Sequence, residues 1–262
     1  MPVKMIVTDL DSTLLRTDKT ISKYTASVFK RCRDKGIKTV FATARPLYLT
    51  TDFLETIVID GLIATNGAFV YANGKIINEH IVPVELSKAL LTELSASSVV
   101  QRIGARKRDV YYTTGPRNET DVYCDFKTPL DETFAHLSFH TEDTAFAAVI
   151  INKYPELEVS YVSGENLYDV GAFGCTKANG VKELASFWGI QIGDIVAFGD
   201  DHNDIEMLEV CGVGVAVANA IDEVIHVAEH VCDTNDNDGV AEWLEDNVLC
   251  VLHTGTKRTL QT

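Results

Sequence analysis

Two carboxylates stand one residue apart near the start of the chain, directly after an apolar run. Residues 5–7 are typical of a strand that is buried on both faces, and Asp9 and Asp11 follow them. Because Asp is a poor strand former, the pair marks the carboxyl end of that strand, which is where open α/β sheets bind their ligands. A divalent cation would relieve the repulsion between the two carboxylates, and hard oxygen ligands favour Mg²⁺. The alternative is a solvated strand-to-loop junction with an Asx turn.

Three further polar clusters each follow a predicted strand or open a predicted helix. They are Thr43 after strand 39–42, Lys177 at the start of helix 177–188, and Asp200, Asn203 and Asp204 after strand 194–198. Because right-handed crossovers join strands that run parallel, a doubly wound sheet brings the carboxyl ends of these strands, and with them the clusters, to the rim that also holds Asp9. A helix dipole disfavours a cation at the helix N-terminus, so a function explains Lys177 better than solvation does.

Together these residue types suit the cleavage of a phosphate ester. That reaction needs charge neutralisation on the transferring oxygens, a nucleophile in line, and a proton for the leaving oxygen. Asp9 could attack phosphorus as a carboxylate nucleophile, and Asp11 could give and then take a proton. Mg²⁺ held by Asp9 and Asp200 would neutralise part of the charge. The donors left for the remaining phosphate oxygens are Thr43, Lys177 and Asn203.

The bulk composition limits the partners. A formal net charge of −15 over 262 residues argues against nucleic acid and anionic membranes, and any phosphate site therefore needs local positive charge. No apolar run approaches the roughly 18 residues of a transmembrane helix, and we expect no signal peptide. The six cysteines are scattered without a C-x-x-C pair. We therefore expect reduced thiols and a cytoplasmic location.

The pattern of predicted secondary structure changes at residue 83. The segments on either side of residues 83–168 alternate strands and helices, whereas this stretch mixes helices with polar, β-leaning segments. We therefore predict an α/β fold, with a doubly wound parallel-sheet core from residues 1–82 and 169–262 and an inserted α+β cap at 83–168. Insertions at the functional edge of an α/β sheet usually cover the site.

Smaller elements are also predicted at both ends of the core. Residues 68–77 are expected to form a hairpin that turns on Asn73-Gly74. Toward the C-terminus we predict an amphipathic helix from 221 to about 230 and a helical turn at 240–244. Beyond residue 245 we expect only a tail.

Four of the polar motifs resemble those of the haloacid dehalogenase superfamily of phosphatases. They are the run from Asp9 to Thr13, Thr43, Lys177, and the run from Gly199 to Asp204. Residues 41–46, the pair Asn66-Gly67 and the large insertion are similar to its Cof-type subfamily, subclass IIB, which carries an α+β cap of the C2 type. The match spans the core almost from end to end, whereas the cap matches in position and length alone.

The resemblance implies a Rossmann-like core, Mg²⁺ as cofactor and a phospho-aspartyl intermediate on Asp9, with Asp11 as the general acid and base. It implies metal contacts from Asp9, from Asp200 and from the backbone of Leu10 and Asp11. The phosphate contacts that it implies are Thr43, Lys177 and Asn203, and we count the adjacent Ala44 with this phosphate loop.

Several residues near the motifs keep two interpretations. Ser12 and Ala44 stand where the family more often has glycine, and Ala44 would be strained if its backbone needs a positive φ. Asp204 has two interpretations. It either orients Lys177 or metal-bound water without binding the metal itself, or it is an ordinary acidic residue in the first turn of a helix. Arg45 is either a phosphate contact or a surface charge. The cap also contains a basic group, which comprises Arg102, Arg106, Lys107 and Arg108. This group either contacts a second anionic or polar end of the substrate or forms a solvated basic loop, and we favour the solvated loop.

The function predicted from these residues is a Mg²⁺-dependent phosphatase of small phosphorylated metabolites, sugar phosphates first. A phosphosugar mutase is the alternative among enzymes, and a bisphosphate activator would distinguish it. A receiver-type signalling domain also uses clustered Asp, Thr and Lys, but it needs only about 120 residues and has no such insertion. A non-catalytic metabolite-binding protein would lack Asp9 or Asp11, and both are present. We expect a monomer or a small homo-oligomer.

Overall fold

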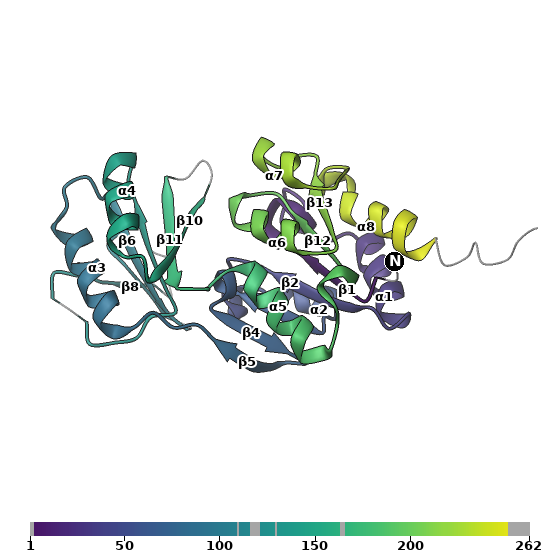
Figure 1. The fold of residues 1–262 in the computed structure, drawn as a ribbon, viewed down its shortest axis with the longest axis horizontal. Coiled ribbons are helices and arrows are strands. Elements are labelled where there is room, and N and C mark those ends of the chain that lie inside the picture. Colours follow the sequence, from purple (N-terminus) through teal and green to yellow (C-terminus); the bar gives the residue numbers. More distant parts are fainter. Residues whose placement is uncertain (1–2, 109, 116–120, 129, 163–165, 251–262) are drawn as a thin grey trace, which may run out of the picture.

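The computed structural model describes residues 3–108, 110–115, 121–128, 130–162 and 166–250. Figure 1 shows two lobes: a core formed by the two ends of the chain and a cap formed by its middle. Two chain segments join them, one leaving the core after β5 and one returning after β11. The predicted fold class, an α/β core with an inserted α+β cap, is confirmed.

The core is built on one sheet, which has eight strands within the described ranges. The strands from β14 to β3 run parallel, and β4 and β5 add the predicted hairpin, with Asn73 and Gly74 at positive φ in its turn. In spatial order the strands are β14 (His230–Cys232), β13 (Val213–Val217), β12 (Ile195–Gly199), β1 (Met5–Thr8), β2 (Lys38–Ala42), β3 (Gly61–Ala64), β4 (Phe69–Ala72) and β5 (Lys75–Glu79).

Helices cover both faces of this sheet, so its central strand is apolar on both sides. In β1, Ile6 packs into one hydrophobic cluster, whereas Met5 and Val7 pack into the other. Helices α1 and α8 lie on the Ile6 side, with α2 near the sheet edge, and α5, α6 and α7 lie on the opposite side. Their bounds are α1 (Lys23–Asp34), α2 (Thr51–Thr56), α5 (Lys177–Trp188), α6 (Ile205–Val210), α7 (Asp222–Val227) and α8 (Gly239–Leu244).

The cap has its own sheet and its own hydrophobic core. Helices α3 (Val84–Ala96) and α4 (Thr144–Lys153) pack on one face of that sheet. Neighbouring strands are antiparallel except for the pair β7 and β8. In spatial order they are β10 (Leu157–Val162), β11 (Leu167–Ala172), β9 (His136–His140), β6 (Arg102–Lys107), β7 (Val110–Thr113) and β8 (Val122–Tyr123). The predicted boundary at residue 168 falls inside β11.

Two predictions near the C-terminus are wrong. The helix expected to reach residue 230 ends at Val227, and His230–Cys232 forms β14. Glu229 N donates to Gly214 O at 2.9 Å, so the backbone there extends the sheet edge instead of continuing the helix.

The segment expected to be a tail also has structure. Residues Glu245–Leu249 continue helically, with Val248 and Leu249 buried against the core. Glu245 accepts from Tyr24 and Arg31, which fixes the segment to α1. Residues 251–262, which the predicted second part of the core includes, lie outside the described residues. In the part of the chain that is described, no helix is both long and apolar enough to span a membrane.

Candidate active site

Lys177 lies at the centre of the candidate site as a buried cation. Its Nζ donates to Asp9 Oδ1 and to Asp204 Oδ1 at 2.7 Å each, and its side chain is 1% exposed. The end of β1 places Asp9, and the first turn of α5 places Lys177, after Thr176 caps the helix by accepting from Asn179 N. A buried charge is stable only when it is paired, and here one cation lies between two anions.

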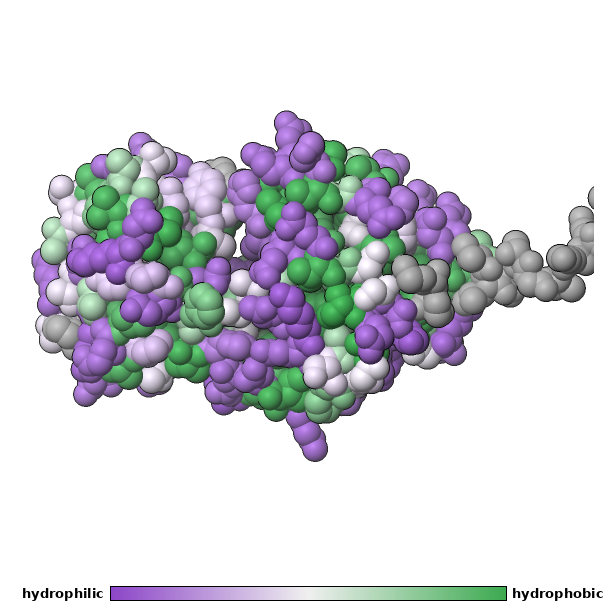
Figure 2. Space-filling view, in the orientation of Figure 1, coloured by the Kyte–Doolittle hydropathy of each residue, from purple (hydrophilic) through white to green (hydrophobic). Residues whose placement is uncertain are grey.

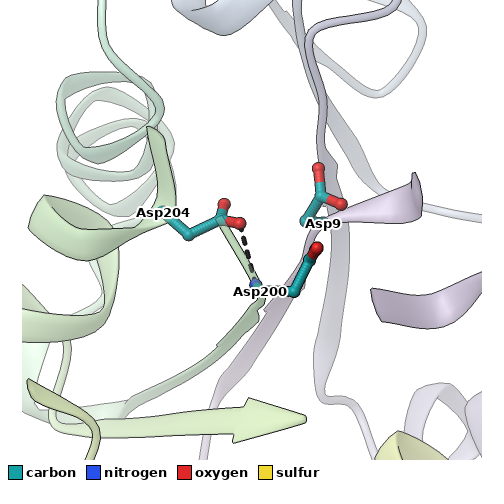
Figure 3. Close-up of side chains that lie close together, drawn as sticks. All are labelled: Asp9, Asp200 and Asp204. Carbon is teal, nitrogen blue, oxygen red and sulfur yellow. Dashed lines mark hydrogen bonds between the residues drawn. The ribbon is translucent and has the colours of Figure 1, made fainter. Parts of the chain in front are cut away.

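Three carboxylates meet beside this lysine, and Figure 3 shows their three side chains. One oxygen each from Asp9, Asp200 and Asp204 lies within 4.8 Å of the others. Burial raises the pKa of Asp9 well above its usual range, although Lys177 opposes the shift. Burial and the neighbouring Asp204 carboxylate raise the pKa of Asp200 to about 7. A hard divalent cation would offset this desolvation and repulsion, so the donor set fits Mg²⁺.

Asp204 is the most firmly held of the three carboxylates. Its Oδ1 accepts from Lys177, and its Oδ2 accepts from the backbone N–H groups of Asp200 at 3.0 Å and Asp201 at 3.3 Å. A side chain at Gly199 would collide with Asp204, so glycine permits this close packing. Of the two interpretations of Asp204, these bonds favour the orienting one, and they leave the other two carboxylates as the principal candidates for binding a metal ion.

Asp11 lies outside this trio and is held by two cations. Arg45 donates to both of its oxygens, from Nε at 2.6 Å and from Nη2 at 2.7 Å, and Lys19 donates to Oδ1 at 2.8 Å. Burial acts to raise the pKa of Asp11, but the hydrogen bonds from Arg45 and Lys19 outweigh it and lower the pKa to about 2. The sequence left the role of Arg45 open and indicated none for Lys19, because no spacing rule pairs them with Asp11.

The backbone strain considered for Ala44 falls at Ser12 instead. Ser12 has φ 60° and ψ 0°, in the left-handed region, and its carbonyl accepts from Asn219 Nδ2 at 2.7 Å. Ala44 is not among the described residues with positive φ. The tight turn after β1 is what brings the Thr13 hydroxyl to the Asp200 carboxylate, to which it donates.

Three of the four predicted phosphate-binding residues share one cavity with the carboxylates. Thr43, Ala44 and Asn203 line a cavity of about 500 Å³ together with Asp9 and Asp11. Thr43 is fully buried, and its hydroxyl accepts from the backbone N–H of residue 45 at 3.1 Å. Lys177 does not line this cavity, which we call the catalytic cavity, but donates to Asp9 and Asp204 in its wall.

The cap supplies residues that sequence reasoning missed. Asn203 Nδ2 donates to Asn66 Oδ1 at 3.0 Å, and Asn66 Nδ2 donates to Asp169 Oδ2 at 3.2 Å, so a hydrogen-bonded chain runs from the core to β11. Asp169 and Leu167 also line the catalytic cavity. Alternation along β11 puts both on one face, but only the fold turns that face toward the core. Figure 2 shows the surface hollowed between the two lobes.

Comparisons with known proteins agree with this geometry. A sequence model of the haloacid dehalogenase-like hydrolases matches residues 6–244. The chain is 28% identical over 263 residues to the 5-amino-6-(5-phospho-D-ribitylamino)uracil phosphatase YitU of Bacillus subtilis, covering 92% of this chain and 96% of that protein. It is 25% identical to the Escherichia coli phosphatase YbjI, which is named for the same substrate, covering 94% of this chain and 96% of that protein.

Solved structures extend the similarity to the whole fold. A phosphatase of the haloalkanoate enzyme superfamily from Bacteroides thetaiotaomicron matches with a TM-score of 0.82 at 25% identity, covering 94% of this chain and 95% of that one. A subclass IIB sugar phosphatase shares the fold with a TM-score of 0.83 at 24% identity, covering 93% of this chain and 98% of that one. The cap as well as the core therefore has counterparts of known structure.

Proposed function

We propose a cofactor, a mechanism and a substrate class for this chain, which belongs to the haloacid dehalogenase-like hydrolases and is a phosphoric monoester hydrolase. The cofactor is Mg²⁺, the mechanism passes through a phospho-aspartyl intermediate, and the substrates are small phosphorylated metabolites such as sugar phosphates. One observation carries the proposal: Lys177 is buried between Asp9 and Asp204 while Asp200 lies beside them.

Asp9 is the nucleophile in this proposal. A bond forms between an oxygen of Asp9 and phosphorus while the bond from phosphorus to the leaving oxygen breaks, and that oxygen takes a proton from Asp11. Water then attacks phosphorus, Asp11 takes the proton back, and the bond to Asp9 breaks to release phosphate. Lys177, Thr43 and Asn203 bind the transferring oxygens as charge develops on them.

Asp11 has to change partners during this cycle. As the structure shows it, Asp11 is a carboxylate bound by Arg45 and Lys19, which suits the base half of the reaction. To act as an acid it must first be protonated, and this requires that the two cations move away.

Mg²⁺ would be held by Asp9 and Asp200, with the backbone of Leu10 and Asp11 nearby, and would supply charge neutralisation for the phosphoryl oxygens. Buried carboxylates with raised pKa values favour this assignment, because a bound cation offsets their repulsion. Two kinds of relative support a small polyhydroxy phosphate ester as substrate. They are the 5-amino-6-(5-phospho-D-ribitylamino)uracil phosphatases and the sugar phosphatase of the same fold.

The remaining assignments follow from composition and fold. We propose a cytoplasmic protein, a monomer or small homo-oligomer, with no nucleic-acid or membrane partner, because the net charge of −15 opposes both. We also propose that the inserted segment predicted as residues 83–168, with the rest of β11, covers the site, and that residues 1–82 and the chain after β11 form the catalytic core. Asp169 in β11 links the two parts.

The test is a screen of phosphorylated metabolites for phosphate release with Mg²⁺ and with EDTA. We expect turnover with Mg²⁺ alone and a loss of about 10⁴-fold or more in Asp9→Asn, which keeps the shape and removes the nucleophile. Asp246→Asn, the same change at an exposed residue outside the cavity, is the matched control and should keep full activity. Turnover that survives in Asp9→Asn contradicts the mechanism. A requirement for a bisphosphate activator favours the mutase.

A further inference from the structure

One face of the cap sheet is polar and faces the core. Along β6, Arg102, Gly104 and Arg106 share a face, whereas the alternate residues Ile103 and Ala105 are buried in the cap core. The strand register places partners of the same kind opposite them on β9: His140 faces Arg102, Ser138 faces Gly104, and His136 faces Arg106. The basic group noted in the sequence is therefore divided: Arg102 and Arg106 lie on this face and Lys107 on the other, and Arg108 follows the end of the strand.

This polar face closes over a second cavity, of about 200 Å³, which we call the arginine pocket. It shares Ala44, Leu167 and Asp169 with the catalytic cavity, so the two cavities adjoin. A phosphate ester with its phosphoryl group on Asp9 would extend past these shared residues. The other residues that line the arginine pocket are Thr65, Arg102, Arg106, Tyr111, His136, Ser138 and His140.

Arg106 is held in place by neutral groups. Its Nη1 donates to the hydroxyl of Tyr48, a core residue, at 3.0 Å, and its guanidinium carbon lies 4.6 Å from the centre of the Tyr111 ring. No carboxylate of the described residues forms an ion pair with it. The neighbouring Lys107 is different, because it is exposed and its Nζ lies 2.9 Å from Glu132.

Gly104 lets the tyrosine reach this position. A side chain there would collide with the Tyr111 hydroxyl and with Ser138. The hydroxyls of Tyr111 and Ser138 are 3.2 Å apart, so they form a hydrogen-bonded wall between the two arginines. The pocket is therefore built from ordered groups rather than from a solvated loop.

The acidic group in the pocket is already engaged. Asp169 accepts from Asn66 through Oδ2, and its Oδ1 lies 3.7 Å from His136 Nδ1. Burial lowers the pKa of His136, which keeps that ring neutral near pH 7. Asp169 keeps its negative charge in these contacts, but two guanidinium groups, those of Arg102 and Arg106, line the pocket against this one carboxylate, in a chain whose net charge is −15.

We propose that the arginine pocket binds a second anionic group of the substrate, a carboxylate or a second phosphate, so that the preferred substrates are phosphate monoesters that carry another acidic group. The proposal rests on the proposed function, since it places the first phosphate at Asp9. Arg106 is the main contact, and Arg102, whose Nε donates to Thr113 at 3.2 Å, adds charge beside it.

The test uses matched pairs of substrates. The carboxylate arm compares 6-phosphogluconate with sorbitol 6-phosphate, and the second-phosphate arm compares fructose 1,6-bisphosphate with fructose 6-phosphate. We expect kcat/KM to favour the acidic member of at least one pair about ten- to a hundredfold, the effect of a charge-assisted hydrogen bond. The pair that shows the preference identifies the second group.

Variants then assign the preference to the pocket. Arg106→Gln should bring the ratio within a pair close to one, whereas the control Lys107→Gln should leave it unchanged. Tyr48→Phe keeps the charge but removes one support of Arg106, so its ratio should fall between these two. A ratio near one in the unmodified enzyme for both pairs overturns the proposal, as does a ratio that survives in Arg106→Gln.

A binding measurement separates this proposal from the proposed function. Calorimetry with Asp9→Asn and the same four esters needs no turnover. Tighter binding of an acidic member, lost when Arg106→Gln is added, supports the pocket even if no phosphate is ever released. Equal binding within both pairs by Asp9→Asn, when the unmodified protein does release phosphate, rejects the pocket and keeps the phosphatase.

Discussion

The catalytic rim of the core and the polar face of the cap sheet both hold charged side chains, but they hold them differently. In the core, Lys177 is 1% exposed and lies between two carboxylates, so each charge depends on the others. In the cap, Arg106 is partly exposed and is held by a hydroxyl and an aromatic ring. The attack on phosphorus needs charges around Asp9 that keep their positions, whereas a variable leaving group needs charges that remain accessible to it.

The largest difference should appear when one cation is removed from each region. Lys177→Met leaves two buried carboxylates unpaired, so we expect a loss of about 3–5 kcal/mol in the free energy of unfolding. Activity should fall about 10³-fold on every substrate. Arg106→Gln should change the preference among substrates instead. Urea denaturation and kinetics on several esters measure both effects.

A matched control lies on the same helix as Lys177. Lys182 is exposed and pairs with Glu206 at 3.2 Å, so Lys182→Met should change stability by no more than about 0.5 kcal/mol. If Lys177→Met proved as mild as Lys182→Met, the core charges would not be interdependent and the comparison would fail.

A second prediction concerns pH and metal in the core. The pKa of Asp200 is raised from 3.8 to about 7 in the metal-free folded state. Between these two pH values the folded state therefore keeps a proton on Asp200 that the unfolded state has already released. This contribution to stability is complete below about pH 4 and is lost as the pH rises toward 7. Mg²⁺ should remove this decline, because it stabilises the carboxylate. Urea denaturation from pH 4 to 8, with EDTA and with Mg²⁺, measures the effect.

Asp200→Asn isolates this group from the other titrating residues. The variant cannot ionise at this position, so its metal-free stability should not show that part of the decline, and Mg²⁺ should stabilise it less. The contrary result is that the variant and the unmodified protein give stability curves that stay parallel at every pH, with equal gains from Mg²⁺. That result would show that the pKa of Asp200 is not shifted and that Asp200 is not a metal ligand.

A smaller effect is expected at the edge between the regions. Arg45→Gln removes the two hydrogen bonds that the guanidinium donates to Asp11 and leaves the one from Lys19, so we expect kcat to fall about tenfold with little change in stability, because the pair is partly exposed. Arg31→Gln, which removes a surface pair with Glu245 at 2.9 Å, is the control and should keep full activity. Equal activities in the two variants would show that Arg45 is a surface charge without a role in the reaction.

The smallest effect tests the backbone of the catalytic rim. Ser12 occupies the left-handed region with φ 60°, so Ser12→Gly should be neutral or stabilising by up to about 1 kcal/mol. Ala44→Gly has no such strain to relieve and should destabilise by about 0.5 kcal/mol. Thermal denaturation of the two variants should therefore give shifts that differ in sign or size. Equal losses would place the strain at neither residue.

The two regions also differ in how far the sequence could predict them. The core site could be read because each functional residue follows a buried strand or opens a helix, and parallel strands bring these ends together. Lys177 and Asp9 are far apart in the chain, yet the motif and the topology together predict their contact. The helical segment after residue 245 and strand β14 were missed, because their structure depends on contacts with α1 and β13 rather than on local periodicity.

The cap could be placed but not read in detail. The roles of Arg106 and Asp169 depend on strand register, which fixes the face that each side chain shares. One-residue alternation in a polar segment is visible in the sequence, but the partner strands and the direction of the face are not. The sequence favoured a solvated basic loop, whereas the structure puts Arg102 and Arg106 into the wall of a cavity.

Rapid quenching of a single turnover, followed by mass spectrometry of the peptide that contains Asp9, tests the central claim most directly. A covalent intermediate predicts that this peptide gains one phosphoryl group early in the turnover and loses it as free phosphate appears. In Asp9→Asn neither the gain nor the phosphate should be seen. Complete turnover with no phosphoryl group ever detected on the protein, or with the group on another residue, would contradict the assignment of Asp9 as the nucleophile.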